Sequence, residues 1–225
     1  MAEATKAAAV GAGSAGEADR LELRISGSGG QGILLAAAVL ADAVAAAGRE
    51  VVQTQSYGPE ARGGASQAEV IASTEPIDYP EVDLADISLC LSQAAFDKYA
   101  HLTREGGLVL YDSDLVDEKE PPGFSLVGLP FTHTATHDLG AKVVTNIVSL
   151  GSLATFIDWL PPDVVDGAVA TRVPEKFKDL NLRALEAGRR LVELSEAGIG
   201  IEGAESHDDF DAGGSIMCEP CGDER

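Results

Sequence analysis

The stretch LELRISGSGGQGILLAAAVLADAVAAA, residues Leu21–Ala47, decides the fold. It opens with a short strand over Leu21–Ser26, passes through a glycine-rich turn and continues as a helix that ends at Gly48. Apolar side chains recur along this helix at spacings of four and three residues, at Ile33, Ala37, Leu40 and Val44. That spacing gathers them on one helical face. A strand, a glycine turn and a helix in this order are the first unit of an α/β fold.

The rest of the chain keeps alternating between strand and helix patterns. Further strands are predicted over Glu50–Gln55, Ala68–Ala72, Asp86–Leu91, Leu108–Asp112 and Gly123–Leu129. Helices are predicted over Gln93–Leu102 and His137–Asp158, and two more are expected to open at Pro161–Pro162 and at Pro174. This order predicts a three-layer α/β fold, Rossmann-like, in which helices cover both faces of a mostly parallel sheet.

Composition and charge argue against several classes of protein. The 225 residues include 37 acids against 16 Lys and Arg, a net charge of −21, which opposes binding to nucleic acid or to an anionic membrane. No stretch approaches the roughly 18 consecutive apolar residues of a membrane span. Three cysteines in a chain of this length do not make a disulfide framework. We therefore expect a protein of the cytoplasm.

The chain divides into three parts by composition. Residues 1–20 mix Ala, Gly and Ser without a large apolar side chain and are expected to form a disordered extension. Residues 21–200 carry the strand and helix patterns and are expected to form one domain. Residues 201–225 lose all periodicity, and because residues 202–225 hold eight acids and one Arg, we expect an acidic disordered tail.

The glycine turn Gly27–Gly32 has the spacing G-x-G-x-x-G between a first strand and a first helix. Its backbone N–H groups lie at the positive end of a helix and suit a phosphate or a carboxylate. A nicotinamide or flavin site also needs an acid at the end of the second strand, and Thr54–Gln55 stand there instead. The turn therefore fits a dinucleotide poorly, and another anion or tight packing remains open.

A second candidate site is the segment QTQSYGPEARGG, Gln53–Gly64, which follows the second strand. Loops that leave the carboxyl ends of neighbouring parallel strands converge on one crevice, so we expect this segment beside the glycine turn. Arg62 lies among glycines, where its guanidinium can hold a carboxylate or phosphate in a forked pair. An equally good interpretation on physical grounds is a surface ion pair between Arg62 and Glu60.

Together with these two motifs, the sequence resembles the gamma subunits of 2-oxoacid:ferredoxin oxidoreductases. It is most similar to those that act on 2-oxoglutarate, and the family also includes enzymes that act on pyruvate and ketoisovalerate. The resemblance is carried by four stretches and covers about residues 21–197. These are RISGSGGQGILLAAAVLADA (Arg24–Ala43), Gln53–Val70, IDYPEVDLADISLCLSQAAFDKY (Ile77–Tyr99) and, more loosely, LGAKVVTNIVSLG (Leu139–Gly151).

The resemblance implies one subunit of an enzyme that decarboxylates a 2-oxoacid oxidatively, forms an acyl-CoA and passes electrons to ferredoxin. It implies alpha and beta partner subunits, and in some complexes a ferredoxin-like delta subunit. Thiamine diphosphate, magnesium and the iron–sulfur clusters would belong to those partners, so this chain would hold no cofactor alone and have no catalytic residue. We expect it to line the substrate and coenzyme A region through Gly29, Gly30, Gln31, Gly32, Tyr57, Gly58, Arg62 and Gly63.

The remaining cysteines and histidines give weak signals. Cys218 and Cys221 form a single C-x-x-C in the acidic tail, and two thiols supply only half of a zinc site. His133 and His137, spaced at i and i+4, would complete four ligands only if the tail reached them. Cys90 lies in an apolar strand and is expected to be a small core residue.

Overall fold

The computed structural model describes residues 20–56, 65–118 and 124–198. The expected N-terminal extension and acidic tail lie outside the described residues, and so does the segment 57–64. Among the residues that are described, no helix combines the length and the apolar character needed to cross a membrane.

Six strands form a single sheet in the order β2-β3-β1-β4-β5-β6. The strands are β1 (Leu21–Ser28), β2 (Glu50–Ser56), β3 (Ala65–Ser73), β4 (Ala85–Cys90), β5 (Thr103–Asp112) and β6 (Ser125–Leu129). The run from β1 through β4 and β5 to β6 is parallel, whereas β3 is antiparallel to both of its neighbours. The prediction of a mostly parallel α/β sheet is therefore confirmed.

The hairpin of β2 and β3 departs from the expected arrangement, because β3 lies between β1 and β2. A parallel return needs a crossover of about a dozen residues. The connection over residues 57–64 is shorter than that and is followed by an antiparallel strand. The expectation that β1 and β2 are neighbours was therefore wrong. Ser28 nevertheless pairs with Ala65, so both ends of the hairpin connection lie at the same sheet edge as the glycine turn.

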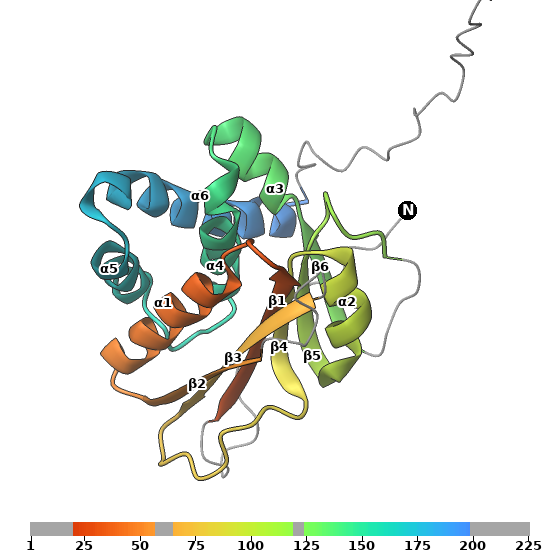
Figure 1. The fold of residues 1–225 in the computed structure, drawn as a ribbon, viewed down its shortest axis with the longest axis vertical. Coiled ribbons are helices and arrows are strands. Elements are labelled where there is room, and N and C mark those ends of the chain that lie inside the picture. The colour runs from red at the N-terminus through yellow and green to blue at the C-terminus, as the bar shows by residue number, and fades with distance from the viewer. Residues whose placement is uncertain (1–19, 57–64, 119–123, 199–225) are drawn as a thin grey trace, which may run out of the picture.

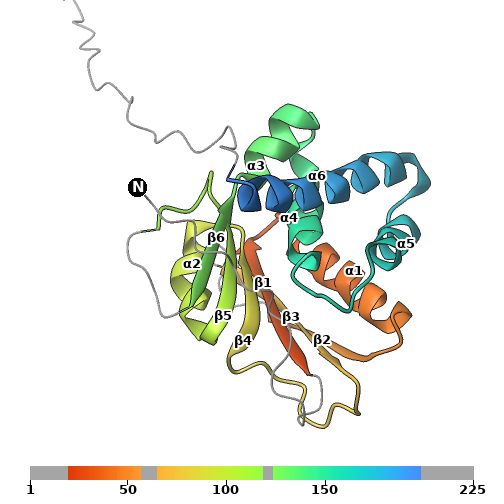
Figure 2. The ribbon, with the colours of Figure 1, turned by 180° about the vertical axis from the view of Figure 1, so that it is seen from behind.

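Helices cover both faces of the sheet, as predicted. They are α1 (Ile33–Ala46), α2 (Gln93–Tyr99), α3 (Phe131–His133), α4 (Thr145–Ala154), α5 (Pro162–Arg172) and α6 (Lys178–Glu196). Figure 1 shows α2 apart from the group of α1, α4, α5 and α6, and Figure 2 shows the same separation from behind. Since α1, α4, α5 and α6 share one core with the sheet and α2 contributes to others, the two groups lie on opposite faces.

The helix predicted over His137–Asp158 is much shorter in the structure. After α3 comes a π-helical turn over Thr134–Asp138, then Gly140 with φ 66°, and α4 begins only at Thr145. The left-handed backbone at Gly140 ends the preceding turn, because an α-helix cannot continue through it. The apolar spacing marked the buried part of this segment correctly but placed its start too early. The two helices expected after the prolines are both present.

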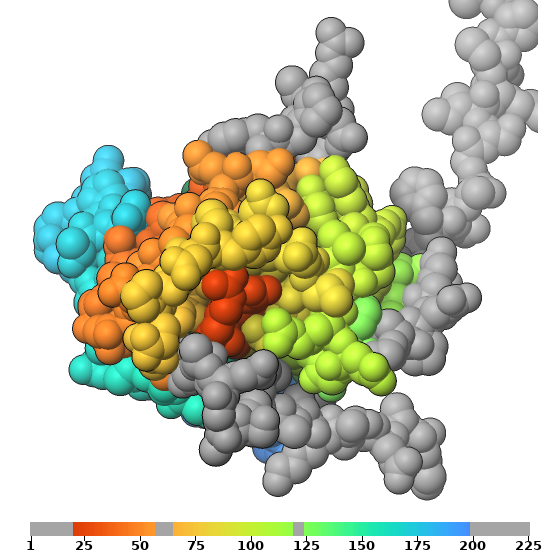
Figure 3. Space-filling view, turned by 90° about the horizontal axis from the view of Figure 1, so that it is seen from below, coloured from red at the N-terminus to blue at the C-terminus, as the bar shows by residue number. Residues whose placement is uncertain are grey.

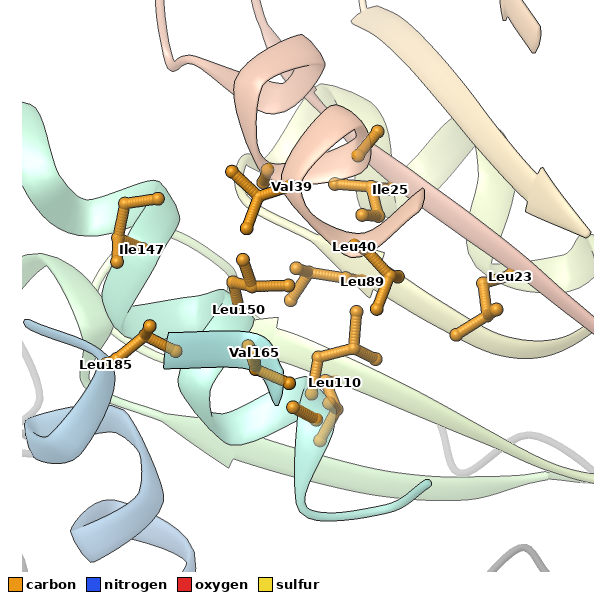
Figure 4. Close-up of a cluster of buried hydrophobic side chains, with 14 of the residues drawn as sticks. Leu23, Ile25, Val39, Leu40, Leu89, Leu110, Ile147, Leu150, Val165 and Leu185 are labelled. Atoms are coloured by element: carbon orange, nitrogen blue, oxygen red, sulfur yellow. The ribbon is translucent and has the colours of Figure 1, made fainter. Parts of the chain in front are cut away.

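The main core lies between the sheet and the helices α1, α4, α5 and α6. Figure 4 shows leucines and isoleucines of the central strands, among them Ile25, Leu89 and Leu110, facing Leu40 of α1 and Leu150 of α4. All five side chains are fully buried. Alternate residues of each strand point into this core, as the two-residue period of a strand requires.

Two glycines bring α4 and α6 into close contact. A Cβ added at Gly151 would meet the carbonyl oxygen of Leu185, and one added at Gly188 would meet that of Val148. The Ser152 hydroxyl also donates a 2.6 Å hydrogen bond to the Gly188 carbonyl. All ten residues of α4 are buried. The absence of side chains at the two glycines therefore sets how closely α6 covers α4.

The opposite sheet face is polar at its centre. The Arg24 side chain is 2% exposed, forms an ion pair of 3.0 Å with Glu69 and donates to the Val82 and Leu102 carbonyls. Seen from the amino end of the parallel strands in Figure 3, the segment of residues 74–84 (yellow) lies beside the start of β1 (red). The Val82 carbonyl of that segment accepts from Arg24, so the buried charge also fixes this segment to the sheet.

Candidate functional site

The carboxyl ends of β1, β4, β5 and β6 lie along one edge of the sheet. The glycine turn follows β1, Leu91 and Ser92 follow β4, Asp112 ends β5, and Pro130 follows β6. In open α/β sheets, ligands bind outside the carboxyl ends of the strands. This edge is therefore the candidate functional site.

The glycine turn has an open apex and an uncapped helix start. Gly30 has φ 87° and Gly32 has φ 71°, both in the left-handed region that favours glycine. A Cβ added at Gly29 or Gly30 would meet nothing within 4 Å, and both residues are exposed. Within the described residues, no side chain caps the start of α1. The first N–H groups of a helix need partners, so this end suits an anion or a polar group of a neighbouring chain.

Gln31 holds the turn in place through both atoms of its side-chain amide. Its Oε1 accepts from the Ser28 N–H at 2.6 Å, and its Nε2 donates to the Leu91 carbonyl at 2.7 Å. The side chain thereby joins the end of β1 to the end of β4. The predicted role of Gln31 as a ligand contact stays a prediction, and the structure shows that its side chain positions the turn.

Asn146 anchors the other end of the turn. Its Nδ2 donates to the Gly32 carbonyl at 3.0 Å, across 114 residues of sequence. A Cβ at Gly32 would lie 2.5 Å from that same nitrogen. Gly32 is thus required both for its left-handed backbone and for the approach of α4. Sequence analysis did not single out Asn146, because no local pattern ties it to the turn.

Two aspartates at the end of β5 organise the start of α3. Asp112 accepts from the Thr132 hydroxyl at 2.6 Å and is fully buried, and burial raises the pKa of its carboxyl to about 6. Asp114 accepts from the His133 backbone N–H at 2.6 Å. Carboxylates near the first turn of a helix satisfy its free N–H groups. Both acids therefore position α3, and sequence analysis had missed their role.

Two exposed apolar side chains lie in segments that adjoin the candidate site. Val143 is 83% exposed and lies three residues before Asn146, which bonds to the turn. Leu115 is 39% exposed, and nearby Asp117 donates its backbone N–H to Gln93, at the start of the helix that follows Leu91. Large exposed apolar side chains at a candidate site indicate an interaction surface. We call Gly29, Gly30, Leu115 and Val143 the docking edge.

Several predicted site residues lie outside the described residues. These are Tyr57, Gly58, Arg62 and Gly63, together with the tail cysteines Cys218 and Cys221. Their predicted roles stay predictions. Among the described residues, no group of three or more His, Cys, Asp or Glu side chains is arranged to hold a metal ion. Cys90 is fully buried, which raises the pKa of its thiol to about 12, and its expected place in the core is confirmed.

Comparison with known proteins identifies what the chain resembles over this domain. A model of the family described as pyruvate ferredoxin/flavodoxin oxidoreductase matches residues 22–191. The chain is 45% identical over 172 residues to 2-oxoglutarate synthase subunit KorC of Methanocaldococcus jannaschii, which covers 75% of the chain and 92% of that protein. It is also 34% identical to ketoisovalerate oxidoreductase subunit VorA of Methanothermobacter marburgensis, over 75% of the chain and 36% of that protein.

A solved structure gives the same result. The gamma subunit of a keto/oxoacid ferredoxin oxidoreductase from Geobacter sulfurreducens superposes with a TM-score of 0.72 at 40% identity. The match covers 78% of this chain and 98% of that one. The resemblance derived from the four sequence stretches is thereby confirmed.

Proposed function

The chain belongs to the pyruvate ferredoxin/flavodoxin oxidoreductase family, and from that premise we propose that it is the gamma subunit of a 2-oxoglutarate:ferredoxin oxidoreductase. The proposed complex converts 2-oxoglutarate and coenzyme A to succinyl-CoA and CO2 and passes the electrons to ferredoxin in the cytoplasm. The observation that carries the proposal is the 45% identity to a 2-oxoglutarate synthase subunit over nearly the whole of that protein.

The geometry of the docking edge supports a role as a partner surface. Catalysis of proton or acyl transfer needs a nucleophile or base within hydrogen-bond reach of the reacting atoms. At this edge, Gln31 and Asn146 are bonded to the backbone, and Asp112 is buried against Thr132. Among the described residues of the docking edge, those that face outward are open backbone and two apolar side chains. Such a surface lines a pocket whose chemistry is supplied by other chains.

In this proposal the docking edge packs against the thiamine-binding alpha and beta subunits. Thiamine diphosphate with its magnesium and the iron–sulfur clusters belong to those partners, which in some complexes include a ferredoxin-like subunit. The turn Gly29–Gly32 and the segment of Tyr57, Gly58, Arg62 and Gly63 line the region of substrate and coenzyme A. The uncapped start of α1 fits a phosphate or carboxylate there, and Arg62 adds a cation.

The second candidate, a free-standing dinucleotide-binding dehydrogenase, is disfavoured by the strand order. In such a domain the acid that binds the ribose stands at the end of the strand next to β1. Here β3 lies next to β1, which moves the end of β2 two strand spacings, roughly 10 Å, from the turn. Thr54 near that end donates to Glu69, which already pairs with Arg24.

Co-purification tests the proposal most directly. The tagged full chain, expressed with its genomic neighbours, is expected to retain alpha and beta chains that carry thiamine diphosphate. The complex should reduce ferredoxin in the presence of both 2-oxoglutarate and coenzyme A. Turnover by this chain alone, or tight binding of NAD, NADP or FAD to it, would contradict the proposal.

In the complex, Arg62→Ala is expected to raise the KM for 2-oxoglutarate or coenzyme A several-fold.

The docking edge is tested by a pair of matched substitutions. Val143→Asp places a charge at the centre of the proposed interface and is expected to weaken assembly at least ten-fold, measured by size-exclusion chromatography of the mixed subunits. Leu84→Asp makes the same change at the opposite edge of the sheet, where Leu84 is 47% exposed, and should leave assembly unchanged. If both variants assembled equally well, Val143 would lie outside the interface and the proposed docking edge would be wrong.

A further inference from the structure

A groove of about 540 Å³ runs beside α6, and the proposed function does not use it. Its lining includes His133 and Leu139 from the segment after β6, and Arg183, Ala187, Arg190 and Leu194 from α6. The α6 residues recur at spacings of four, three and four, so they form one stripe along the helix. We call this feature the α6 groove.

The α6 groove combines an apolar floor with cationic sides. Leu139, Ala187 and Leu194 are apolar and only partly buried, so they remain available for contact. Within the described residues, Arg190 has no ion-pair partner, and Arg183 reaches Asp179 only at 3.9 Å with both side chains exposed. Glu186 in the lining already pairs with Arg189. Asp138 also lines the groove, so two arginines stand there with two acids, of which Glu186 is paired.

The two arginines of the groove belong to a chain with a net charge of −21, and the segment after α6 carries the opposite charge. Residues 202–225 hold eight acids and one Arg, and they include the run Asp208-Asp209-Phe210-Asp211. An aromatic side chain flanked by carboxylates matches an apolar floor flanked by guanidinium groups. The same segment adds Ile216 and Met217 as further apolar side chains.

The connection between groove and tail favours an intramolecular contact. Leu194 lines the groove and lies four residues before Gly198, the last residue described before the tail. Phe210 is the twelfth residue after Gly198, a span of up to about 40 Å when extended. The groove between Leu194 and Arg183 is about 17 Å of helix, well within that reach. A short tether gives an effective concentration in the millimolar range, far above that of a free partner.

We propose that the α6 groove binds the acidic C-terminal segment of the same chain, with Phe210 on the apolar floor and Asp208, Asp209 and Asp211 facing Arg183 and Arg190. The binding of this segment is electrostatic in large part and weakens as salt screens the charges.

Disulfide trapping tests this contact in the full chain, because the tail carries its own thiols at Cys218 and Cys221. Ala187→Cys adds a thiol of similar size to the groove floor, and oxidised glutathione supplies the oxidant. Peptide mapping by mass spectrometry then measures how fast position 187 pairs with the tail. The control, Gly167→Cys, adds an exposed thiol on α5, where a Cβ meets nothing within 4 Å. Cys90 does not compete, because it is buried in the sheet.

The Ala187→Cys variant is expected to form the intramolecular disulfide at least ten times faster than the Gly167→Cys variant. Charge reversal by Arg183→Glu with Arg190→Glu, or 0.5 M salt, should remove most of that advantage. Lys176→Glu, a reversal at an exposed position before α6, should leave it unchanged. Equal rates at positions 187 and 167, or a disulfide found only between two copies, would overturn the proposal.

Discussion

The two faces of the sheet are covered in different ways, although the same strands form both. On the face of α1, α4, α5 and α6, aliphatic side chains such as Leu89 and Leu110 pack in one large apolar cluster. On the face of α2, Arg24 and Glu69 form a buried ion pair, and the hydroxyls of Ser88 and Thr103 lie 2.7 Å apart. Four helices cover the first face with apolar side chains, whereas α2 is seven residues long, and the second face combines smaller apolar clusters with buried hydrogen bonds.

This difference implies that substitutions on the two faces lower the free energy of unfolding in different ways. A truncated leucine loses contacts that no other change restores, because the cavity itself costs free energy. A truncated member of a polar pair leaves its partner buried and unsatisfied, and removing that partner as well restores much of the loss. The polar face specifies which groups must meet, and the apolar face requires mainly the right volume.

The largest expected effect comes from breaking the buried ion pair. Arg24→Leu leaves Glu69 buried without its guanidinium and should lower the free energy of unfolding by about 3 to 5 kcal/mol. The double variant Arg24→Leu/Glu69→Leu should recover at least half of that loss. Denaturant unfolding of the wild type, both single variants and the double variant measures the coupling. Additive losses would show that the pair is not a unit.

An intermediate effect is expected at Asp112, a buried carboxyl at the end of the apolar face. Its pKa is raised to about 6 in the folded chain, from 3.8, so the folded state binds the proton more tightly. Its contribution is complete below pH 3.8 and is lost as pH rises through about 6, a change of about 3 kcal/mol. Asp112→Asn should remove this dependence, measured as the difference between the two unfolding profiles from pH 3.5 to 7.5. Parallel profiles would refute it.

The smallest expected effect comes from the hydroxyl pair of the polar face. Ser88→Ala leaves the buried Thr103 hydroxyl without this partner and should cost about 1 to 2 kcal/mol of unfolding free energy. Adding Thr103→Val should bring the loss below that of Ser88→Ala alone. Thermal unfolding monitored by circular dichroism measures both changes. A double variant less stable than the sum of its parts would contradict this view of the polar face.

Sequence patterns predicted the fold well where they are local. The apolar spacing of Leu21–Ala47 gave the first strand, the turn and the first helix, and Pro162 marked the start of α5. The hairpin of β2 and β3 was missed, although its connection of eight residues is too short for a parallel return. The predicted helix over His137–Asp158 is interrupted at Gly140, whose left-handed backbone periodicity does not reveal.

The candidate site was predicted only in part, for a physical reason. The glycine spacing identified the turn, because backbone conformation leaves a local signature. Gln31 and Asn146 act through partners 60 and 114 residues away, so their positioning roles depend on tertiary contacts that a single sequence does not display. The apolar side chains of the docking edge likewise look like core residues until the fold exposes them, as Val143 shows at 83% exposure.

The complete burial of α4 has a consequence for how this domain opens. Its ten residues lie between the sheet and α6, and Gly151 and Gly188 leave no room for a water layer between the two helices. Solvent deuterium reaches the amides of α4 only when the helical layer separates from the sheet. The hydrogen-exchange rate of these amides therefore reports the global unfolding of the domain and does not respond to local motion at the edges of the sheet.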